Sequence, residues 1–93
     1  MKLPISYKDS HWSVRKQARL QYVEQQLGKC WYCQNLLTSE PVQAVLSKPI
    51  DHKLFPPGMF DYPVHLHHDH KSGMTIGAVH NKCNAILWQY DGQ

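Results

Sequence analysis

The sequence predicts a small α+β domain in which an N-terminal helix, a β-hairpin and a C-terminal helix share one core. Residues 10–28 carry apolar side chains at helical spacing, and residues 63–91 begin with the alternation of a strand. Two short Cys/His motifs, in 30–33 and 80–83, lie beside these elements. Residues 1–93 are expected to form a single domain, and a chain this short buries only about 60% of its unfolded surface, so its core needs further support.

Composition narrows the functional classes. Three cysteines cannot all pair with one another, which argues against a secreted disulfide framework. The N-terminal residues lack the apolar core of a signal peptide, and no apolar run approaches the ~20 residues of a membrane span. We therefore expect a cytoplasmic protein with reduced thiols and no membrane association. The net charge of +3 permits a polyanionic partner without requiring one.

The first helix is predicted from an apolar stripe. Trp12, Leu20, Val23 and Leu27 fall on one face, which we expect to be buried. Lys16 interrupts this stripe, but its long aliphatic stem can lie along apolar surface.

The ends of this helix and its basic side chains carry separate expectations. Asp9 or Ser10 is placed to cap its start, and Gly28 suits a left-handed residue at its end. Arg15 and Arg19 lie four residues apart beside the stripe. They form either a solvated basic face or a ridge that contacts phosphates.

Residues 34–62 are a connecting segment with little regular pattern. A short helix is expected in SEPVQAVLSK, with Ser39 as its cap and Pro41 in its first turn. Further along, repeated prolines and Gly58 favour irregular structure.

The C-terminal part predicts strand, turn, strand and helix. Residues 64–67 alternate apolar and polar side chains, and Lys71-Ser72-Gly73 suits a hairpin turn in which Gly73 takes a positive φ. Residues 74–79 are rich in β-favouring side chains and form the expected return strand. A helix should follow from His80 or Asn81 to Tyr90, and its buried residues should include Ile86 and Leu87.

The two Cys/His motifs predict a structural zinc site. Cys30 and Cys33, like His80 and Cys83, have the spacing that lets a tight turn present two ligands to one ion. Zinc accepts a tetrahedral Cys3His set, which would use every cysteine in the chain. The alternatives are small buried cysteines with a hydrogen-bonded core histidine, or a redox dithiol. A dithiol would leave the spacing of the second pair unexplained.

The remaining histidines suggest a second site. On an alternating strand His65 and His67 share one face with Asp69, whereas His68 and His70 lie on the other. Hydrolysis of a nucleotide with a single divalent ion needs a metal ligand, an adjacent general base and a second ligand from elsewhere in the fold. A histidine pair at the end of a strand supplies the first two. Asn84, on the following helix, is placed to supply the third.

These motifs together resemble the HNH, or ββα-metal, endonucleases. The resemblance rests on Cys-x-x-Cys, then residues 67–73 (HHDHKSG), then residues 80–84 (HNKCN), and covers residues 30–33 and 65–92. The most similar branch is that of phage recombination endonuclease VII, with its Asp-His-Asp-His, Thr-Gly turn and Cys-x-x-Cys-Asn.

The resemblance implies a role for each matched residue. His68 would be the general base that activates water, His67 and Asn84 would hold a catalytic Mg²⁺ or Mn²⁺ ion, and His70 would support the site or contact phosphate. The chain departs from the branch at His67, which stands in place of Asp. Imidazole suits Mn²⁺, Ni²⁺ or Zn²⁺ better than Mg²⁺, so other divalent ions are also candidates. The second departure, His80 in place of a zinc-binding Cys, is chemically mild.

Other residues near the motifs have competing interpretations. His65 suits a structural or surface role more than a catalytic one. Asp69 is placed to orient a histidine, to pair with Lys71 or to face solvent in the hairpin. Asn81 suits a helix cap. Lys71 and Lys82 are placed to touch phosphate or simply to remain solvated.

The resemblance thus implies a metal-dependent DNA endonuclease, acting on duplex or branched DNA by nicking or by cutting both strands. The main alternative is a zinc-stabilised nucleic-acid-binding module with little or no catalytic activity, and an RNA nuclease or toxin-like effector is a third. By the same resemblance the protein would be a phage protein that acts in the host cytoplasm. Whether it would work alone, as a homodimer or with a phage protein partner stays open.

Overall fold

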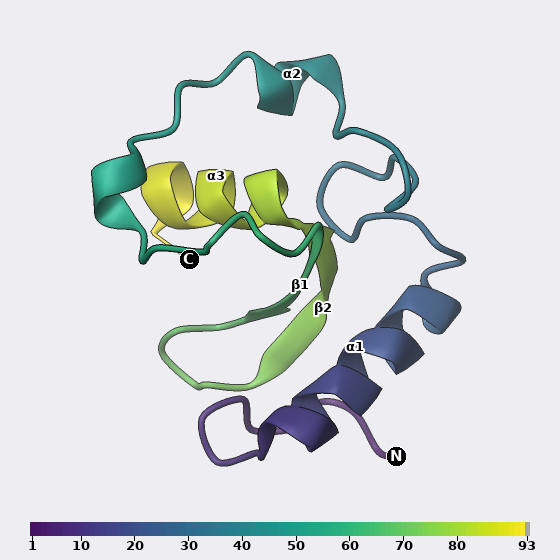
Figure 1. The fold of residues 1–93 in the computed structure, drawn as a ribbon. Helices are drawn as coiled ribbons and strands as arrows, with labels where there is room; N and C mark the ends of the chain where they lie inside the picture. The colour runs from purple at the N-terminus through teal and green to yellow at the C-terminus, as the bar shows by residue number, and fades with distance from the viewer. Residues whose placement is uncertain (93) are drawn as a thin grey trace.

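The computed structural model describes residues 1–92 and has the predicted α+β class, with a two-stranded antiparallel sheet and helices around it. In chain order the elements are α1 (Trp12–Gln25), α2 (Gln43–Leu46), the 3₁₀ helix η1 (His52–Leu54), β1 (Val64–His68), β2 (Thr75–His80) and α3 (Asn81–Asp91). Both α1 and α3 pack on the hairpin, and α2 packs on α3 within a long connection that arcs over it (Figure 1). No helix of the described residues is long and apolar enough to cross a membrane.

The hairpin formed by β1 and β2 is the centre of the fold. Val64 lies opposite His80 and His67 opposite Gly77, and the register then shifts before His68, which pairs with Thr75. An irregularity of this kind bends a strand and re-aims the side chains next to it. As predicted, the turn contains Gly73 with a positive φ, of 76°.

The outer edge of β2 is covered by parts of the chain that are distant in sequence. Residue 75 exchanges two hydrogen bonds with Ile5: its N–H donates to the Ile5 carbonyl, and its hydroxyl accepts from the Ile5 N–H. Further along the strand, the Gln26 side-chain amide bonds both the N–H and the carbonyl of Ala78, each at 2.9 Å. These contacts satisfy edge groups that would otherwise be open to pairing with another chain.

The buried face of α1 is not the predicted stripe. Trp12, Leu20 and Leu27 are 67%, 57% and 80% exposed, and the buried residues are Ala18 and Tyr22. Of the predicted stripe, Val23 alone packs against the core, where it is partly buried. The small Ala18 permits close approach to the hairpin, and the Tyr22 hydroxyl bonds the Thr75 hydroxyl at 2.9 Å. The buried face of α1 is therefore set by contact with the hairpin and not by the positions of the largest apolar side chains.

The ends of the helices also differ in part from expectation. His11 caps α1 through Nδ1, which accepts from the Ser13 N–H, so the prediction of Asp9 or Ser10 was wrong. Gly28 is left-handed as expected, although the helix already ends at Gln25.

The connecting segment is mostly irregular, as its composition predicted. The short helix α2 begins only after Val42, which makes no side-chain cap, so Ser39 does not cap it and Pro41 lies outside it. By contrast, α3 matches its predicted bounds closely. The core lies between α1, the hairpin and α3, and its buried apolar side chains include Ala18, Tyr22, Val45, Leu66, Ala78, Val79, Ile86 and Leu87.

Candidate metal centre and hydrolytic site

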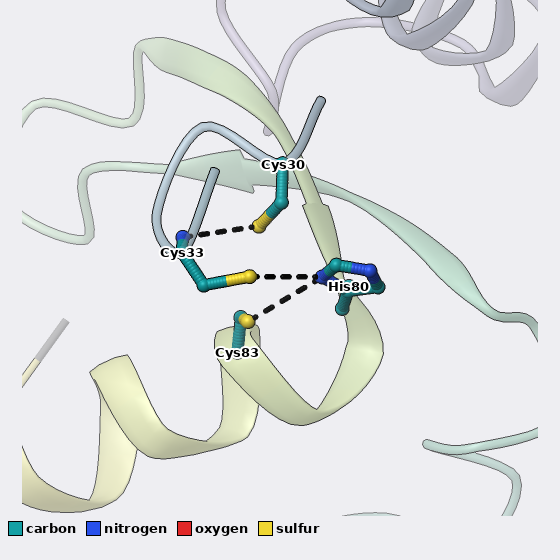
Figure 2. A group of neighbouring side chains, drawn as sticks. All are labelled: Cys30, Cys33, His80 and Cys83. Carbon is teal, nitrogen blue, oxygen red and sulfur yellow. Dashed lines mark hydrogen bonds between the residues drawn. The ribbon is translucent and has the colours of Figure 1, made fainter. Parts of the chain in front are cut away.

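Four side chains from three parts of the chain meet beside the base of the hairpin. Cys30 and Cys33 come from the turn after α1, His80 ends β2, and Cys83 lies in the first turn of α3, with all four pointing toward one another (Figure 2). Their candidate ligand atoms all lie within 4.8 Å of one another, and no two of the cysteines are joined in a disulfide. The predicted Cys3His set is therefore brought together by the fold.

The local backbone explains how Cys30 and Cys33 are presented. A bridge between Lys29 and Leu36 closes the turn, and Gln34 takes a left-handed φ of 70° within it. The Cys33 N–H points at the sulfur of Cys30 at 3.5 Å. A backbone N–H directed at sulfur stabilises the thiolate form, which is the form that binds metal.

The distances within the cluster suit a tetrahedral ion. Nδ1 of His80 lies 3.5 Å from Sγ of Cys33 and 3.6 Å from Sγ of Cys83. Zinc bonds of about 2.3 Å to sulfur and about 2.0 Å to nitrogen, at tetrahedral angles, put the two ligand atoms about 3.6 Å apart.

The tautomer of His80 is fixed from outside the cluster. Its Nε2 lies 2.9 Å from the carbonyl oxygens of both Leu36 and Ser39, and a nitrogen facing two acceptors must carry the hydrogen. Nδ1, which faces the cysteines, is then unprotonated and able to bind a metal. Ligand histidines are commonly oriented by a backbone carbonyl in this way.

The pKa values of Cys30 and Cys83 are shifted in opposite directions because the two thiols lie close together. The hydrogen bond from Cys83 lowers the pKa of Cys30 to about 4, while the same contact and burial raise the pKa of Cys83. A bound cation would replace the thiol proton that Cys83 shares with Cys30, since metal binding displaces protons from thiol ligands. The arrangement can bind one metal ion and is consistent with structural zinc.

His67 lies in β1, next to Trp31 of the turn that carries Cys30 and Cys33. The residue is 1% exposed, its ring centroid lies 5.5 Å from that of Trp31, and its Nε2 has no hydrogen-bond partner among residues 1–92. Burial lowers the pKa of His67, and the nearby Asn84 side chain and Asp69 partly oppose this effect. Buried polar atoms without a partner are rare in folded proteins, so this nitrogen is available to a water molecule or to a ligand.

Asn84 reaches the hairpin from α3 and is held there by His65. Its amide nitrogen donates to Nδ1 of His65 at 3.1 Å. Burial lowers the pKa of His65, which favours the neutral ring that this bond requires. The bond fixes the amide so that its carbonyl oxygen is left for another partner. His65, which the sequence did not place in the site, is thus a contact of Asn84.

His68 is half-buried against the N-terminal segment. Its ring is stacked on the Tyr7 ring, with centroids 4.0 Å apart and planes within 9° of parallel. The guanidinium of Arg15 lies 4.0 Å from the same Tyr7 ring and donates to the Tyr7 carbonyl. Burial lowers the pKa of His68, and His70, His67 and Arg15 add to the lowering. A neutral imidazole of this kind can accept a proton near neutral pH.

His68 and Asn84 both open onto solvent-filled space. They line a groove of about 600 Å³ beside α1 and also a smaller cavity of about 250 Å³ beside Trp88. His70 lines the smaller cavity, is exposed, and lies edge-on to His68 with ring centroids 4.8 Å apart. The fold therefore gathers His67, His68, Asn84 and His70 into one neighbourhood, with His67 buried and the others accessible.

Several neighbouring residues have structural roles. The Asp69 carboxylate accepts from the Lys71 N–H and the Ser72 hydroxyl, so it belongs to the hairpin turn. Asn81 donates to the carbonyls of Phe60 and Tyr62 and anchors the connecting segment.

Tyr7 gave no signal in the sequence. The N-terminal segment that carries it is docked on the hairpin, where the Tyr7 N–H donates to the Gly73 carbonyl. Arg15 was noted for its charge alone, and its contact with Tyr7 depends on the same docking.

Comparison of the chain with protein-family models, with curated proteins and with solved structures found no match.

Proposed function

We propose that the protein is a metal-dependent DNA endonuclease of the HNH type that hydrolyses phosphodiester bonds. The observation that carries the proposal is the buried, unpartnered Nε2 of His67, adjacent in the chain to an accessible His68 and close to Asn84. Such hydrolysis needs a metal ligand, an adjacent base that opens onto a groove and a second ligand from elsewhere in the fold, and His67, His68 and Asn84 are suited to these three roles. The HNH-like order of the motifs adds independent support.

In this proposal His68 is the general base. Its ring takes a proton from a water molecule as the water oxygen attacks phosphorus. The bond from phosphorus to the 3′ oxygen then breaks, which leaves a 5′-phosphate and, after protonation, a 3′-hydroxyl. Burial favours the neutral form of His68 that this step requires, and Tyr7 fixes the plane of the ring.

The residues suited to hold a catalytic divalent ion are His67, through Nε2, and Asn84, through its carbonyl oxygen. Bound there, Mg²⁺ or Mn²⁺ would act as a Lewis acid that stabilises negative charge on phosphate and on the leaving oxygen. The imidazole ligand favours Mn²⁺, Ni²⁺ or Zn²⁺ over Mg²⁺. His70, at the rim, is suited to contact the phosphate.

The test is the nicking of supercoiled plasmid by purified protein, with and without EDTA. The His68→Ala variant should lose about 10²- to 10⁴-fold of the nicking rate, the usual contribution of a general base. Its zinc content and circular dichroism spectrum should stay those of the wild type. His52→Ala is the matched control, because His52 is an exposed histidine in η1 and does not line the groove.

Near wild-type nicking by His68→Ala would refute the role of this residue. The alternative of a nucleic-acid-binding module without hydrolytic activity is favoured by the basic side chains of α1 beside the site. Plasmid that is bound but left intact in Mg²⁺, Mn²⁺ and Ni²⁺ alike would establish that alternative.

A further inference from the structure

A groove between α1 and β1 runs up to the proposed hydrolytic site. It has a volume of about 600 Å³ and includes His68 and Asn84 in its lining. Its far wall is α1, which the resemblance to HNH nucleases does not cover. A groove of this size is in the range of ligand-binding clefts rather than of flat docking faces.

The charge of the groove is one-sided. Arg15, Lys16 and Arg19 of α1 line it, and none of its lining residues is acidic. Within residues 1–92 the one ion pair joins Lys82 to Glu40, so the three cations of the groove are not neutralised by carboxylates. Arg19 is close enough to His65 to contribute to the lowered pKa of that residue. The groove therefore suits a chain of phosphates.

Two of the aromatic residues that line the groove are largely exposed to solvent. Trp12 is 67% exposed and Tyr62 is 73% exposed, one from the start of α1 and the other from the connecting segment. Exposed aromatic rings beside a basic channel are the stacking platforms on which proteins hold unpaired bases. In a continuous duplex the base faces are already stacked and cannot meet these rings.

We propose that this groove binds a single strand of DNA next to the scissile phosphate. Arg15, Lys16 and Arg19 contact its phosphates, and Trp12 and Tyr62 stack on its bases. The inference rests on the proposed function and deepens it, because it names the surface that holds the substrate. It also gives the outward-facing Trp12 a function that helix packing does not supply.

The test is fluorescence anisotropy with the full chain and no added divalent ion, so that binding is measured without hydrolysis. The probes are a labelled oligothymidylate and a labelled hairpin duplex of equal length. The single strand should bind more tightly than the duplex. Trp12→Ala and Tyr62→Ala should each weaken its binding about five-fold or more. Arg19→Ala should reduce the slope of log affinity against log salt by about 0.7, as expected for one lost phosphate contact.

The controls are Lys53→Ala and Tyr90→Ala, which remove an exposed cation and an exposed ring outside the groove and should leave binding unchanged. Circular dichroism verifies the fold of every variant. The proposal is overturned if the folded Trp12, Tyr62 and Arg19 variants bind like the wild type, or if the duplex binds as tightly as the single strand. Tighter binding of oligouridylate would overturn the choice of DNA.

The two proposals fail in different ways. Specific strand binding through Trp12 and Arg19 with no cleavage in any divalent ion would refute the nuclease and keep the groove. Plasmid nicking by the wild type, together with oligothymidylate binding that is not weakened in the folded Trp12→Ala and Arg19→Ala variants, would refute the groove and keep the nuclease.

Discussion

The Cys3His cluster and the proposed hydrolytic site (His67, His68, His70 and Asn84) adjoin in α3, where Cys83 and Asn84 are consecutive. The environments of these two residues differ. Cys83 belongs to a cluster in which His80 already has its outer hydrogen bonds and the ligand atoms face one another. Asn84 faces a groove, and Nε2 of the nearby His67 has no hydrogen-bond partner within the described part of the chain.

The difference separates a closed site from an open one. Structural zinc sites are filled by four protein ligands, whereas catalytic sites keep a position for water or substrate. In the Cys3His cluster the protein supplies all four ligand atoms. At the proposed hydrolytic site, His68 and Asn84 line an open groove, as the proposed exchange of substrate and metal ion requires. Four predictions test this contrast, beginning with the largest effect.

Replacing Cys83 by Ser should unfold the protein. A structural zinc contributes roughly 10–16 kcal/mol, which is comparable to the whole stability of a small domain, roughly 5–15 kcal/mol. Metal analysis should find roughly one zinc ion per wild-type chain and far less in the variant, and the thermal transition should disappear. Ser39→Ala is the control, because only the backbone carbonyl of Ser39 contacts His80. If the Cys83→Ser protein were folded and free of zinc, the cluster would be a set of buried cysteines in the core and not a metal site that the fold requires.

Dialysis against metal-free buffer should distinguish the two sites without mutation. The closed cluster should keep its zinc and the fold, while the open site should lose its ion. Nicking should fall to background and return on addition of Mg²⁺ or Mn²⁺, with no change in circular dichroism. Full activity of dialysed protein that contains zinc alone would mean that no exchangeable ion is needed.

His67→Asp should change the preferred ion of the open site by several-fold. A carboxylate is a harder ligand than imidazole, so the rate in Mg²⁺ should rise relative to the rate in Mn²⁺ or Ni²⁺. The buried carboxylate should also make the melting temperature rise when Mg²⁺ is added. His67→Ala is the comparison and should be poorly active in every ion. An unchanged ion preference in His67→Asp would remove His67 from the ligand set.

His65→Ala should have the smallest effect of the four. It removes the acceptor that holds the Asn84 amide, and the loss of such a supporting contact typically costs about ten-fold or somewhat more in metal affinity or activity. The Mg²⁺ or Mn²⁺ concentration for half-maximal nicking should rise accordingly, while zinc content stays constant. If half-saturation does not move, Asn84 is held by other contacts or does not bind the ion.

Some parts of the structure follow from local sequence alone. The strand alternation at 64–67, the glycine turn and the helix after His80 all depend on neighbouring residues, and their bounds agree with expectation within one or two positions. The Cys3His set was also predictable, because two pairs of ligands with turn spacing leave few other partners for one ion.

Other features depend on contacts between distant residues. The buried face of α1 was predicted wrongly, because the hairpin selects Ala18 for close packing and leaves Trp12 outside. The stack of Tyr7 on His68 requires the N-terminal segment to dock on the hairpin turn, and the bond from Asn84 to His65 requires α3 to lie across β1. The sequence by itself determined that four Cys and His side chains have the spacing of metal ligands and that four other histidines gather in the hairpin. Only the tertiary structure decided that the four-residue Cys3His set closes on itself and that His68 and Asn84 line a basic groove, because accessibility and unpaired atoms arise from packing between segments far apart in the chain.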